Sequence, residues 1–259
     1  MCRMAAWSGA AQPLSALLYD APHSLEHQSF APESMLSGRV NVDGTGVAWW
    51  PTRGAGEPLC YRSERPPWSD GNLQRLTPRL TAQVQLLLVR SATLGQGMGE
   101  AAVGPFTGDG LALAHNGFVE HWQPRARRVM LALLDDDLFA RSRAGTDSEV
   151  LFLHMLQRRR ELPAAPIAEL LAVTLERFRA ELAGLGVAAR LDVLASDGEE
   201  VAAARCSLEL ASNTLFMGLR GDGIAFASEP LDPAWGFEPL PPNEVVATHG
   251  VQTQRRPLV

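Results

Sequence analysis

Two long helical segments in the middle of the chain, with strand-like segments on both sides, constrain the fold most. Thr146 as N-cap, with Glu149 three residues later, forms a capping box, and apolar residues follow at helical spacing. A second apolar stripe of helical period begins after Pro166 and runs over 167–182. No linker or repeat interrupts the pattern. We therefore expect one α+β domain over residues 1–259, with helices packed on antiparallel sheets.

The expected strands fall into a group before the helices and a group after them. Continuous apolar runs predict the first group, and runs joined by glycine-containing turns predict hairpins in the second. The predicted strands are 2–8, 47–50, 59–61, 84–89, 111–114, 191–195, 201–206, 215–219 and 224–227, and short helices are expected at 14–19 and 72–80. Residues 20–45 show no period, and so long a loop in a compact domain is typically functional.

Composition argues against several functional classes. A net charge of −6 and a pI near 5.5 disfavour a nucleic-acid partner. No apolar run approaches the ~20 residues of a membrane span, and the first residues lack the features of a signal peptide. The cysteines Cys2, Cys60 and Cys206 have neither a disulfide pattern nor metal-ligand spacing. We expect a cytoplasmic protein without metal or other cofactor, and the sequence leaves its oligomeric state open, a homo-oligomer included.

Cys2 is the strongest candidate nucleophile. Removal of Met1 would leave a thiol and a free α-amine on the same residue. A thiol reacts as its thiolate and needs a base within reach, and a terminal amine with a pKa near ~8 can accept its proton. One residue would then supply both nucleophile and base. The alternative is that Cys2 is a small buried hydrophobe, because free cysteines are usually buried and inert.

Other residues fit the chemistry of breaking a γ-glutamyl amide, whose glutamyl part is a zwitterion. Arg90 at a strand end can hold the α-carboxylate with its guanidinium fork, beside the hydroxyl of Thr93. Asp147 can pair with the α-ammonium. The side-chain amide of Asn116 and the backbone N–H of Gly117 can stabilise the negative charge that develops on the attacked carbonyl.

Each of these residues also has an ordinary structural explanation. A lone arginine at a strand end commonly lies at the surface, and an aspartate in a first helical turn is favoured by the helix dipole. Asn116-Gly117 is a common turn signal. His115, beside them, is assigned to the substrate-binding set only as an orienting residue. The combination with Cys2, rather than any single residue, favours catalysis.

The order of these motifs resembles the class II glutamine amidotransferases. The motifs are Cys2, Arg90-Ser91-Ala92-Thr93-x-Gly95, His115-Asn116-Gly117 and Asp147-Ser148-Glu149. The resemblance implies an N-terminal-nucleophile hydrolase with a four-layer α/β/β/α sandwich of antiparallel sheets. It also implies that Cys2 attacks the amide, Arg90 and Thr93 hold the α-carboxylate, Asn116 and Gly117 form the oxyanion hole, and Asp147 holds the α-amine.

The resemblance is closest to the amidohydrolase branch that acts in ergothioneine biosynthesis, and it runs nearly end to end. Further stretches that carry it are 20–25, 28–32, 41–47, 105–106 and 227–230. It implies hydrolysis of γ-glutamyl-hercynylcysteine sulfoxide to hercynylcysteine sulfoxide and glutamate through a thioester on Cys2. The chain ends soon after the matching region, so we expect no synthase domain. The alternatives are a glutaminase subunit that supplies ammonia to a separate synthetase, a γ-glutamyl peptidase that acts on glutathione, and a non-catalytic γ-glutamyl-binding protein.

The leaving part of such a substrate carries a trimethylammonium group, which aromatic faces bind well. Trp7, Trp49, Trp50 and Trp68 all lie in the first 70 residues. We expect at least one of them to line the pocket beyond the scissile amide, with residues 20–45 as its wall. The alternative, which holds for most of them, is that they pack in the core.

Overall fold

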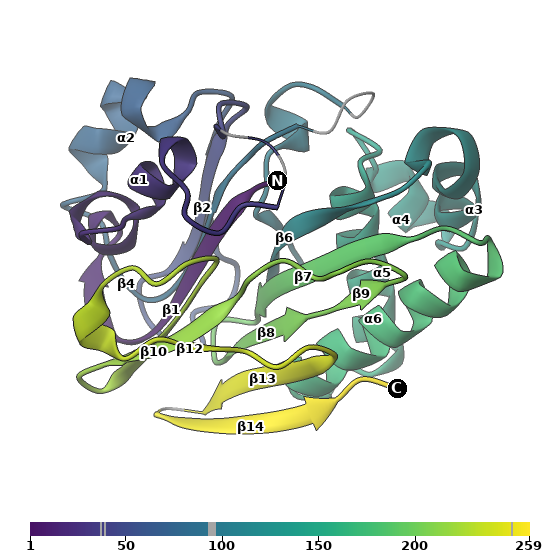
Figure 1. Cartoon of the computed structure of the whole chain (residues 1–259). Helices are drawn as coiled ribbons and strands as arrows, with labels where there is room; N and C mark the ends of the chain where they lie inside the picture. Colours follow the sequence, from purple (N-terminus) through teal and green to yellow (C-terminus); the bar gives the residue numbers. More distant parts are fainter. Residues whose placement is uncertain (37, 39, 93–96, 250) are drawn as a thin grey trace.

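The computed structural model describes residues 1–259 except 37, 39, 93–96 and 250 (Figure 1). In this part of the chain all strand pairings are antiparallel, and the strands form two sheets. The first sheet has the order β12-β10-β11-β1-β4-β2-β3, with β1 Arg3–Pro13, β2 Thr45–Trp50, β3 Leu59–Ser63, β4 Thr81–Val89, β10 Phe216–Arg220, β11 Gly223–Ala227 and β12 Glu238–Pro239. The second has the order β14-β13-β8-β7-β6-β5 with β9 beside β7, and comprises β5 Phe106–Gly108, β6 Leu111–Val119, β7 Ala189–Ser196, β8 Val201–Arg205, β9 Ser207–Leu208, β13 Glu244–His249 and β14 Gln252–Pro257.

Helices cover the outer face of each sheet. The α-helices are α1 Leu25–Phe30, α2 Gly71–Leu76, α3 Arg127–Ala132, α4 Asp136–Arg141, α5 Asp147–Glu161 and α6 Ile167–Gly184. Short 3₁₀ or π turns are η1 Ala16–Asp20, η2 Pro67–Ser69, η3 Glu100–Ala102, η4 Trp122–Ala126 and η5 Pro233–Trp235. Among the described residues no helix is long and apolar enough to cross a membrane.

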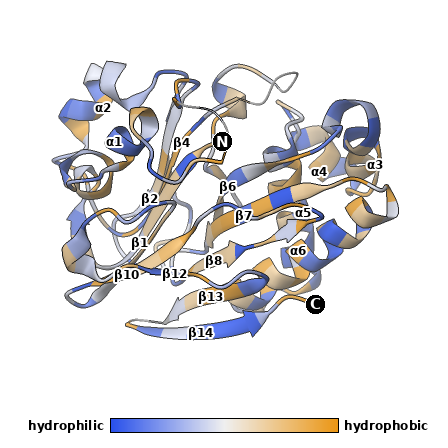
Figure 2. Ribbon diagram, in the orientation of Figure 1, coloured by the Kyte–Doolittle hydropathy of each residue, from blue (hydrophilic) through white to orange (hydrophobic). Residues whose placement is uncertain are grey.

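Three hydrophobic clusters separate four layers of structure. One packs the first sheet against η1, α1 and α2, and another packs the second sheet against α3, α5 and α6. The third lies between the two sheets. Figure 2 shows hydrophobic residues concentrated on central strands such as β7 and β8, whereas the edge strand β14 is hydrophilic. The predicted α/β/β/α sandwich is therefore confirmed.

The cluster between the sheets contains many small side chains. Ala6 and Ala48 of the first sheet and Ala112, Ala114 and Ala203 of the second are all fully buried there. Alanine side chains on facing strands allow the two backbones to approach more closely than leucine would, because interiors are packed to high density. The separation of the sheets therefore depends on these positions.

Most predicted elements are present, but several differ in extent or were not predicted. Residues 20–45 contain the helix α1, whose N-cap Ser24 accepts a hydrogen bond from the backbone N–H of His27 at 3.3 Å. The strand predicted at 111–114 continues to Val119, so His115, Asn116 and Gly117 lie within β6 and not at its end. Strand β1 continues past the predicted end because its register against β4 shifts between Ser8 and Gln12.

The C-terminal half of the second sheet includes the hairpin β13–β14, which the sequence patterns did not predict. Its outer strand reads Gln-Thr-Gln-Arg-Arg-Pro and is mostly exposed. Such a strand has no apolar alternation, so its partner β13 determines its structure. The predicted helix at 72–80 is also shorter, because α2 ends at Leu76.

A buried carboxylate links the start of β1 to the 20–45 segment. Glu229, just after β11, accepts a hydrogen bond from the Arg3 guanidinium at 3.0 Å and lies 2.7 Å from Nε2 of His23. Its oxygens also accept the backbone N–H groups of Glu33 and Ser34, both at 2.9 Å. Burial opposes ionisation of Glu229, but these donors together hold its pKa below the usual value.

Replacing Glu229 with Gln should lower the unfolding free energy at neutral pH by about 3–5 kcal/mol, because it leaves the buried Arg3 charge uncompensated. The pKa of Glu229 is depressed in the folded state, so its contribution is present above the unfolded pKa and is lost as pH falls through the folded pKa. The difference between the two proteins should therefore narrow in acid. Urea denaturation at several pH values measures this, and a difference that is constant with pH would contradict it.

Candidate active site

The thiol of Cys2 lies between the two sheets, directly before β1. Cys2 is 9% exposed and belongs to the central cluster with Met4 and Ala6. The backbone N–H of Ser91 points at its Sγ atom at 3.4 Å. The Cys2 thiol also points at the carbonyl of Ser91 at 3.8 Å, so the residue that follows Arg90 contacts the sulfur through both of its backbone polar groups.

Strand alternation places two other candidates on the same face as Cys2. Side chains two residues apart point to the same side of a strand. In β4, Leu86 and Leu88 face the other sheet, so Arg90, which follows the strand, continues that row. In β6, Ala112 and Ala114 face the first sheet, and Asn116 is next in the row. Cys2, Arg90 and Asn116 therefore project into the space between the sheets.

Arg90 is held in place by the chain on both sides of it. It is 6% exposed, its backbone N–H donates to the carbonyl of Gly44 at 2.8 Å, and its guanidinium donates to the carbonyl of Gly97 at 2.7 Å. Asp43 accepts the backbone N–H of Ala92 at 2.7 Å. These bonds tie residues 43–44 to the segment that follows β4, so the end of the 20–45 segment forms a wall beside Arg90.

Asn116 is fully buried, yet neither its Nδ2 nor its Oδ1 has a hydrogen-bond partner among the described residues. A buried amide without partners is costly, so an unpaired one indicates a site for a ligand. The backbone N–H of Val119 points away from β7, because it donates to Asp147 at 2.9 Å. By the alternation of an antiparallel strand, the N–H of Gly117 points to that same side.

Gly117 is required by close packing rather than by a positive φ. A Cβ atom at this position would lie 2.0 Å from the carbonyl oxygen of Arg190 and 2.6 Å from Nε2 of His115. Any side chain would therefore displace β7 or the His115 ring.

Asp147 and His115 meet at the start of α5. Asp147 is 3% exposed, and its carboxylate accepts the backbone N–H groups of Val119 at 2.9 Å and Ser148 at 2.7 Å. The His115 ring lies 2.8 Å from the Ser148 hydroxyl and 2.9 Å from the carbonyl of Arg190. Both ring nitrogens are thus engaged by protein groups, which fits an orienting residue. Thr93 lies outside the described residues.

The side chains of Thr146 and Glu149 hold in place the loop that precedes Asp147. The Thr146 hydroxyl accepts the N–H of Glu149 at 3.1 Å, as a capping box requires. The Glu149 carboxylate accepts the backbone N–H groups of Arg143 at 2.8 Å and Gly145 at 2.6 Å. The loop before α5 is therefore tied to the first turn of the helix that carries Asp147.

Asn41 is a site residue that sequence reasoning missed. It is fully buried, and its backbone N–H donates to the carbonyl of Ser29 at 2.7 Å. Its side-chain amide donates to the carbonyl of Met1, and its Oδ1 has no partner among the described residues. Asn41 thus contacts the peptide bond whose cleavage would release the α-amine of Cys2. It lies in one of the stretches that carried the family resemblance, but no local pattern marks it.

A second missed group lies beside Asn116. Asp192 of β7 is directly opposite Asn116 in the sheet and is also fully buried. Asn213 connects the two, because its N–H donates to Oδ2 of Asp192 at 3.0 Å and its side chain donates to the carbonyl of Asn116 at 2.8 Å. Burial raises the pKa of Asp192 to about 7, although the Asn213 N–H favours the ionised form.

Comparison with known proteins decides the family. Residues 16–217 match the family described as glutamine amidotransferases class-II. This chain belongs to the class II glutamine amidotransferases. The predicted family, and with it the prediction of an amidohydrolase, is thereby confirmed.

Curated relatives of this amidotransferase-family chain include hydrolases of similar length. It is 30% identical over 258 residues to the gamma-glutamyl-hercynylcysteine sulfoxide hydrolase of Mycolicibacterium smegmatis, with 100% of both chains covered. It is 30% identical over 246 residues to the protein of that name in Mycobacterium tuberculosis, covering 95% of this chain and 92% of the relative.

Solved structures share the fold of the family. A class-II glutamine aminotransferase domain protein from Silicibacter pomeroyi aligns with a TM-score of 0.72 at 23% identity and covers 100% of both chains. Glutamine phosphoribosylpyrophosphate amidotransferase of Bacillus subtilis aligns with a TM-score of 0.62 at 18% identity, covering 99% of this chain and 49% of that one.

Replacing Asp192 with Asn should change how stability depends on pH. Between about pH 4 and about pH 7 the folded chain keeps a proton on Asp192 that the unfolded chain releases, so the stability of the native protein falls as pH rises. Asparagine does not ionise and should remove this loss, which amounts to about 4 kcal/mol when the pKa rises from 3.8 to about 7. Urea denaturation near pH 5 and near pH 8 tests this. Equal pH dependence in both proteins would contradict it.

Proposed function

We propose that this protein hydrolyses a γ-glutamyl amide through a thioester on Cys2. The observation that carries the proposal is the buried, unpartnered amide of Asn116, which faces the same space between the sheets as Cys2 and Arg90. An oxyanion hole needs donors that no protein group occupies, at a position where charge develops in the transition state. The N–H of Gly117, on the open side of β6, is the second donor.

The glutamyl group binds as a zwitterion in this proposal. Arg90, after β4 of the first sheet, pairs with its α-carboxylate, and Asp147, at the start of α5, pairs with its α-ammonium. Asp147 retains acceptor capacity, because each carboxylate oxygen can accept more than one hydrogen bond. The γ-carbonyl then lies between Cys2 and Asn116, where attack and charge stabilisation coincide.

The reaction proceeds in two balanced halves. The α-amine of Cys2, free once Met1 is removed, takes the thiol proton while Sγ bonds to the γ-carbonyl carbon. The tetrahedral intermediate collapses, the C–N bond breaks, and the ammonium returns that proton to the leaving nitrogen. Water then adds to the thioester and gives its proton to the amine. The C–S bond breaks, glutamate leaves, and the thiol regains the proton.

Asn41 supports the first half of this reaction. Its side chain contacts the Met1 carbonyl, and its Oδ1 is buried without a partner in the described structure. After removal of Met1, the α-amine of Cys2 lies near this place, and Asn41 can accept a hydrogen bond from it through Oδ1 once its amide group turns by half a rotation. This contact would orient the lone pair of the neutral amine toward the thiol.

For the substrate we propose γ-glutamyl-hercynylcysteine sulfoxide, the compound in the names of the mycobacterial relatives. Trp7, Trp49 and Trp50 are buried in the core. Trp68 is different, because it is 37% exposed and stacks edge-on against Phe30 with ring centroids 5.7 Å apart.

Two hydrogen bonds connect the segment of the exposed aromatic pair to the N-terminus. Phe30 directly follows Ser29, and the Ser29 carbonyl accepts a hydrogen bond from the backbone N–H of Asn41. The side chain of Asn41 in turn donates to the Met1 carbonyl. Aromatic faces bind a quaternary ammonium that cannot donate N–H hydrogen bonds. Phe30 and Trp68 are therefore our candidates for the trimethylammonium subsite. Phe30 belongs to the 20–45 segment, and Trp68 of η2 packs against it.

The three cysteines should respond differently to two reagents. A glutamine-like electrophile should add once, on Cys2, because only that thiol has the adjacent amine and the glutamyl site. A general alkylating reagent should react first with the exposed Cys60, whereas burial raises the pKa of the Cys206 thiol to about 11 and protects it. Intact-mass and peptide mass spectrometry, with Cys60→Ser as control, distinguish these sites. Addition of the glutamine-like reagent at Cys60 or Cys206 would refute the assignment.

Substrate comparison tests the function itself. The value of kcat/KM should be highest for γ-glutamyl-hercynylcysteine sulfoxide and much lower for glutathione and glutamine. Trp68→Leu should reduce it for the betaine substrate by roughly two- to thirtyfold, the range expected for a cation–π contact of about 0.5–2 kcal/mol. The same variant should leave glutamine turnover unchanged. Phe139→Leu, at an exposed aromatic of α4, is the matched control. Equal turnover of glutamine and the betaine substrate would indicate a general glutaminase instead.

A further inference from the structure

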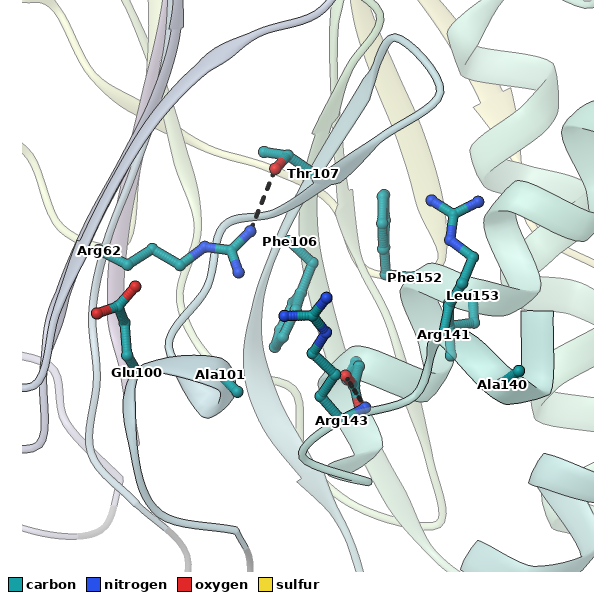
Figure 3. A pocket seen from close by; sticks show the side chains of 11 residues that line it. Arg62, Glu100, Ala101, Phe106, Thr107, Ala140, Arg141, Arg143, Phe152 and Leu153 are labelled. Carbon is teal, nitrogen blue, oxygen red and sulfur yellow. Dashed lines mark hydrogen bonds between the residues drawn. The ribbon is translucent and has the colours of Figure 1, made fainter. Parts of the chain in front are cut away.

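A cavity of about 550 Å³, whose lining does not include Cys2, lies where the edges of the two sheets meet (Figure 3). Strand β3 is the edge of the first sheet and β5 the edge of the second. The cavity opens between them and is completed by η3, the end of α4 and the start of α5. A Cβ atom on Gly46 would lie 2.1 Å from the carbonyl oxygen of Gly104, so the chain before β5 packs directly on β2.

Arginines from three separate segments line this cavity. They are Arg62 of β3, Arg141 at the end of α4 and Arg143 in the loop before α5. The chain contains no lysine, so an arginine alone indicates little. Their convergence is more informative, and Figure 3 shows the guanidinium groups of Arg62 and Arg143 extending toward the same space in front of Phe106.

The positive charge of the cavity is only partly compensated. Arg141 pairs with Asp109 at 2.9 Å, but both side chains are at least 36% exposed, so the pair is weak. Arg62 donates to the Thr107 hydroxyl at 3.2 Å, and its Nε is buried without a partner among the described residues. Among the described residues, no group forms a hydrogen bond or an ion pair with the Arg143 guanidinium.

Two acids, Glu100 and Glu149, also line the cavity and offset part of its positive charge, but neither is ion-paired with an arginine of the cavity. The Glu149 carboxylate is taken up by backbone N–H groups of the loop before α5 and by the Ser142 hydroxyl at 2.9 Å. Glu100 is exposed at the rim on the Arg62 side, and no ion pair of 4.0 Å or less joins it to an arginine of the cavity. Among the described residues, Arg62 and the exposed Arg143 are therefore the guanidinium groups of the cavity that have no ion-pair partner within 4.0 Å.

The opposite wall of the cavity is aromatic. Phe106 and Phe152 stack with centroids 6.4 Å apart, and the Arg62 guanidinium lies 5.7 Å from the Phe106 ring. A guanidinium that lies over an aromatic ring keeps the N–H groups at its edge free. These groups can bind an anion that lies in the plane of the guanidinium. The cavity thus combines charge for two negative oxygens with a flat apolar surface.

We propose that this cavity binds a small organic dianion with a flat apolar body, either a phosphomonoester or a dicarboxylate. Arg62 and Arg143 hold the charged group, and the Phe106–Phe152 wall packs against the body. This site is separate from the glutamyl site and does not depend on the proposed function.

Binding should also affect the glutamyl site, and this extension does rest on the proposed function. Arg143 and Glu149 belong to the loop and helix that position Asp147, and Glu100 lies close after Gly97, which accepts from Arg90. A dianion that orders these segments favours glutamyl binding, and by linkage the glutamyl group favours the dianion equally.

Calorimetric titration of the full chain tests the site directly. Phenyl phosphate and phthalate are the two dianion probes, with inorganic phosphate and benzoate as controls for the ring and for the second charge. One of the two dianion probes should bind in a 1:1 ratio and more tightly than both controls. Binding of phenyl phosphate would identify the ligand as a phosphomonoester, and binding of phthalate would identify it as a dicarboxylate. Affinity should weaken with added salt.

Arginine-to-methionine variants test which arginines bind the dianion. Arg62→Met and Arg143→Met should each weaken binding about tenfold, the loss expected for one charged hydrogen-bond donor. Arg79→Met, at an exposed arginine after α2, should have no effect. Arg143 is exposed, so its variant serves even if Arg62→Met does not fold. Absence of 1:1 binding at low salt, or equal binding by the Arg143→Met and native proteins, would overturn the proposal.

The coupled effect is measured separately. The dianion should lower KM for a γ-glutamyl amide in the native protein and leave KM unchanged in Arg143→Met. If the native protein binds the dianion but turns over no γ-glutamyl amide, the proposed function fails and the site remains. If turnover is normal and the dianion does not bind, only the site fails.

Discussion

The buried carboxylate of Glu229 is the contact on which the geometry of the candidate site depends. It joins the first residues of β1 to His23 and to the backbone at Glu33 and Ser34. Arg3, its cationic partner, is the immediate neighbour of Cys2. A charge pair taken out of water is retained only when its geometry is well satisfied, and such a pair specifies position more than it adds stability. The N-terminal residue and the irregular 20–45 segment are thus placed by the same side chain.

The two sheets contribute different parts of the proposed chemistry. The first sheet supplies Cys2 and Arg90, whereas the second supplies Asn116 and, through the helix packed on it, Asp147. No covalent linkage is needed to align them, because alternation along each strand already directs these side chains to one space or to its border. The arrangement relies on rigid strands for precision, which suits a reaction in which attack and charge stabilisation must coincide within a small volume.

Much of the fold could be predicted from local patterns. The helices α5 and α6 and the hairpins around Gly198 and Gly221 follow from periodicity and turn residues, which act over a few positions. Helix α1 has only six residues, and its hydrogen bonds depend on the Ser24 cap and on distant contacts, so no stripe marks it. Asn116 and Asp147 could be proposed from their chemistry and motif order. Asn41 and Asp192 could not, because their roles arise from partners that lie far away in sequence.

The alanines between the sheets give the molecule a means of adjustment that involves no substrate contact. Ala6, Ala48, Ala112, Ala114 and Ala203 set how near the two sheets lie, and the proposed nucleophile and the proposed oxyanion donors belong to opposite sheets. One added methyl group at such a position acts as a spacer between two halves of the catalytic apparatus. A substitution at one of these alanines would therefore change the proposed chemistry by moving the two sheets apart, without touching the substrate.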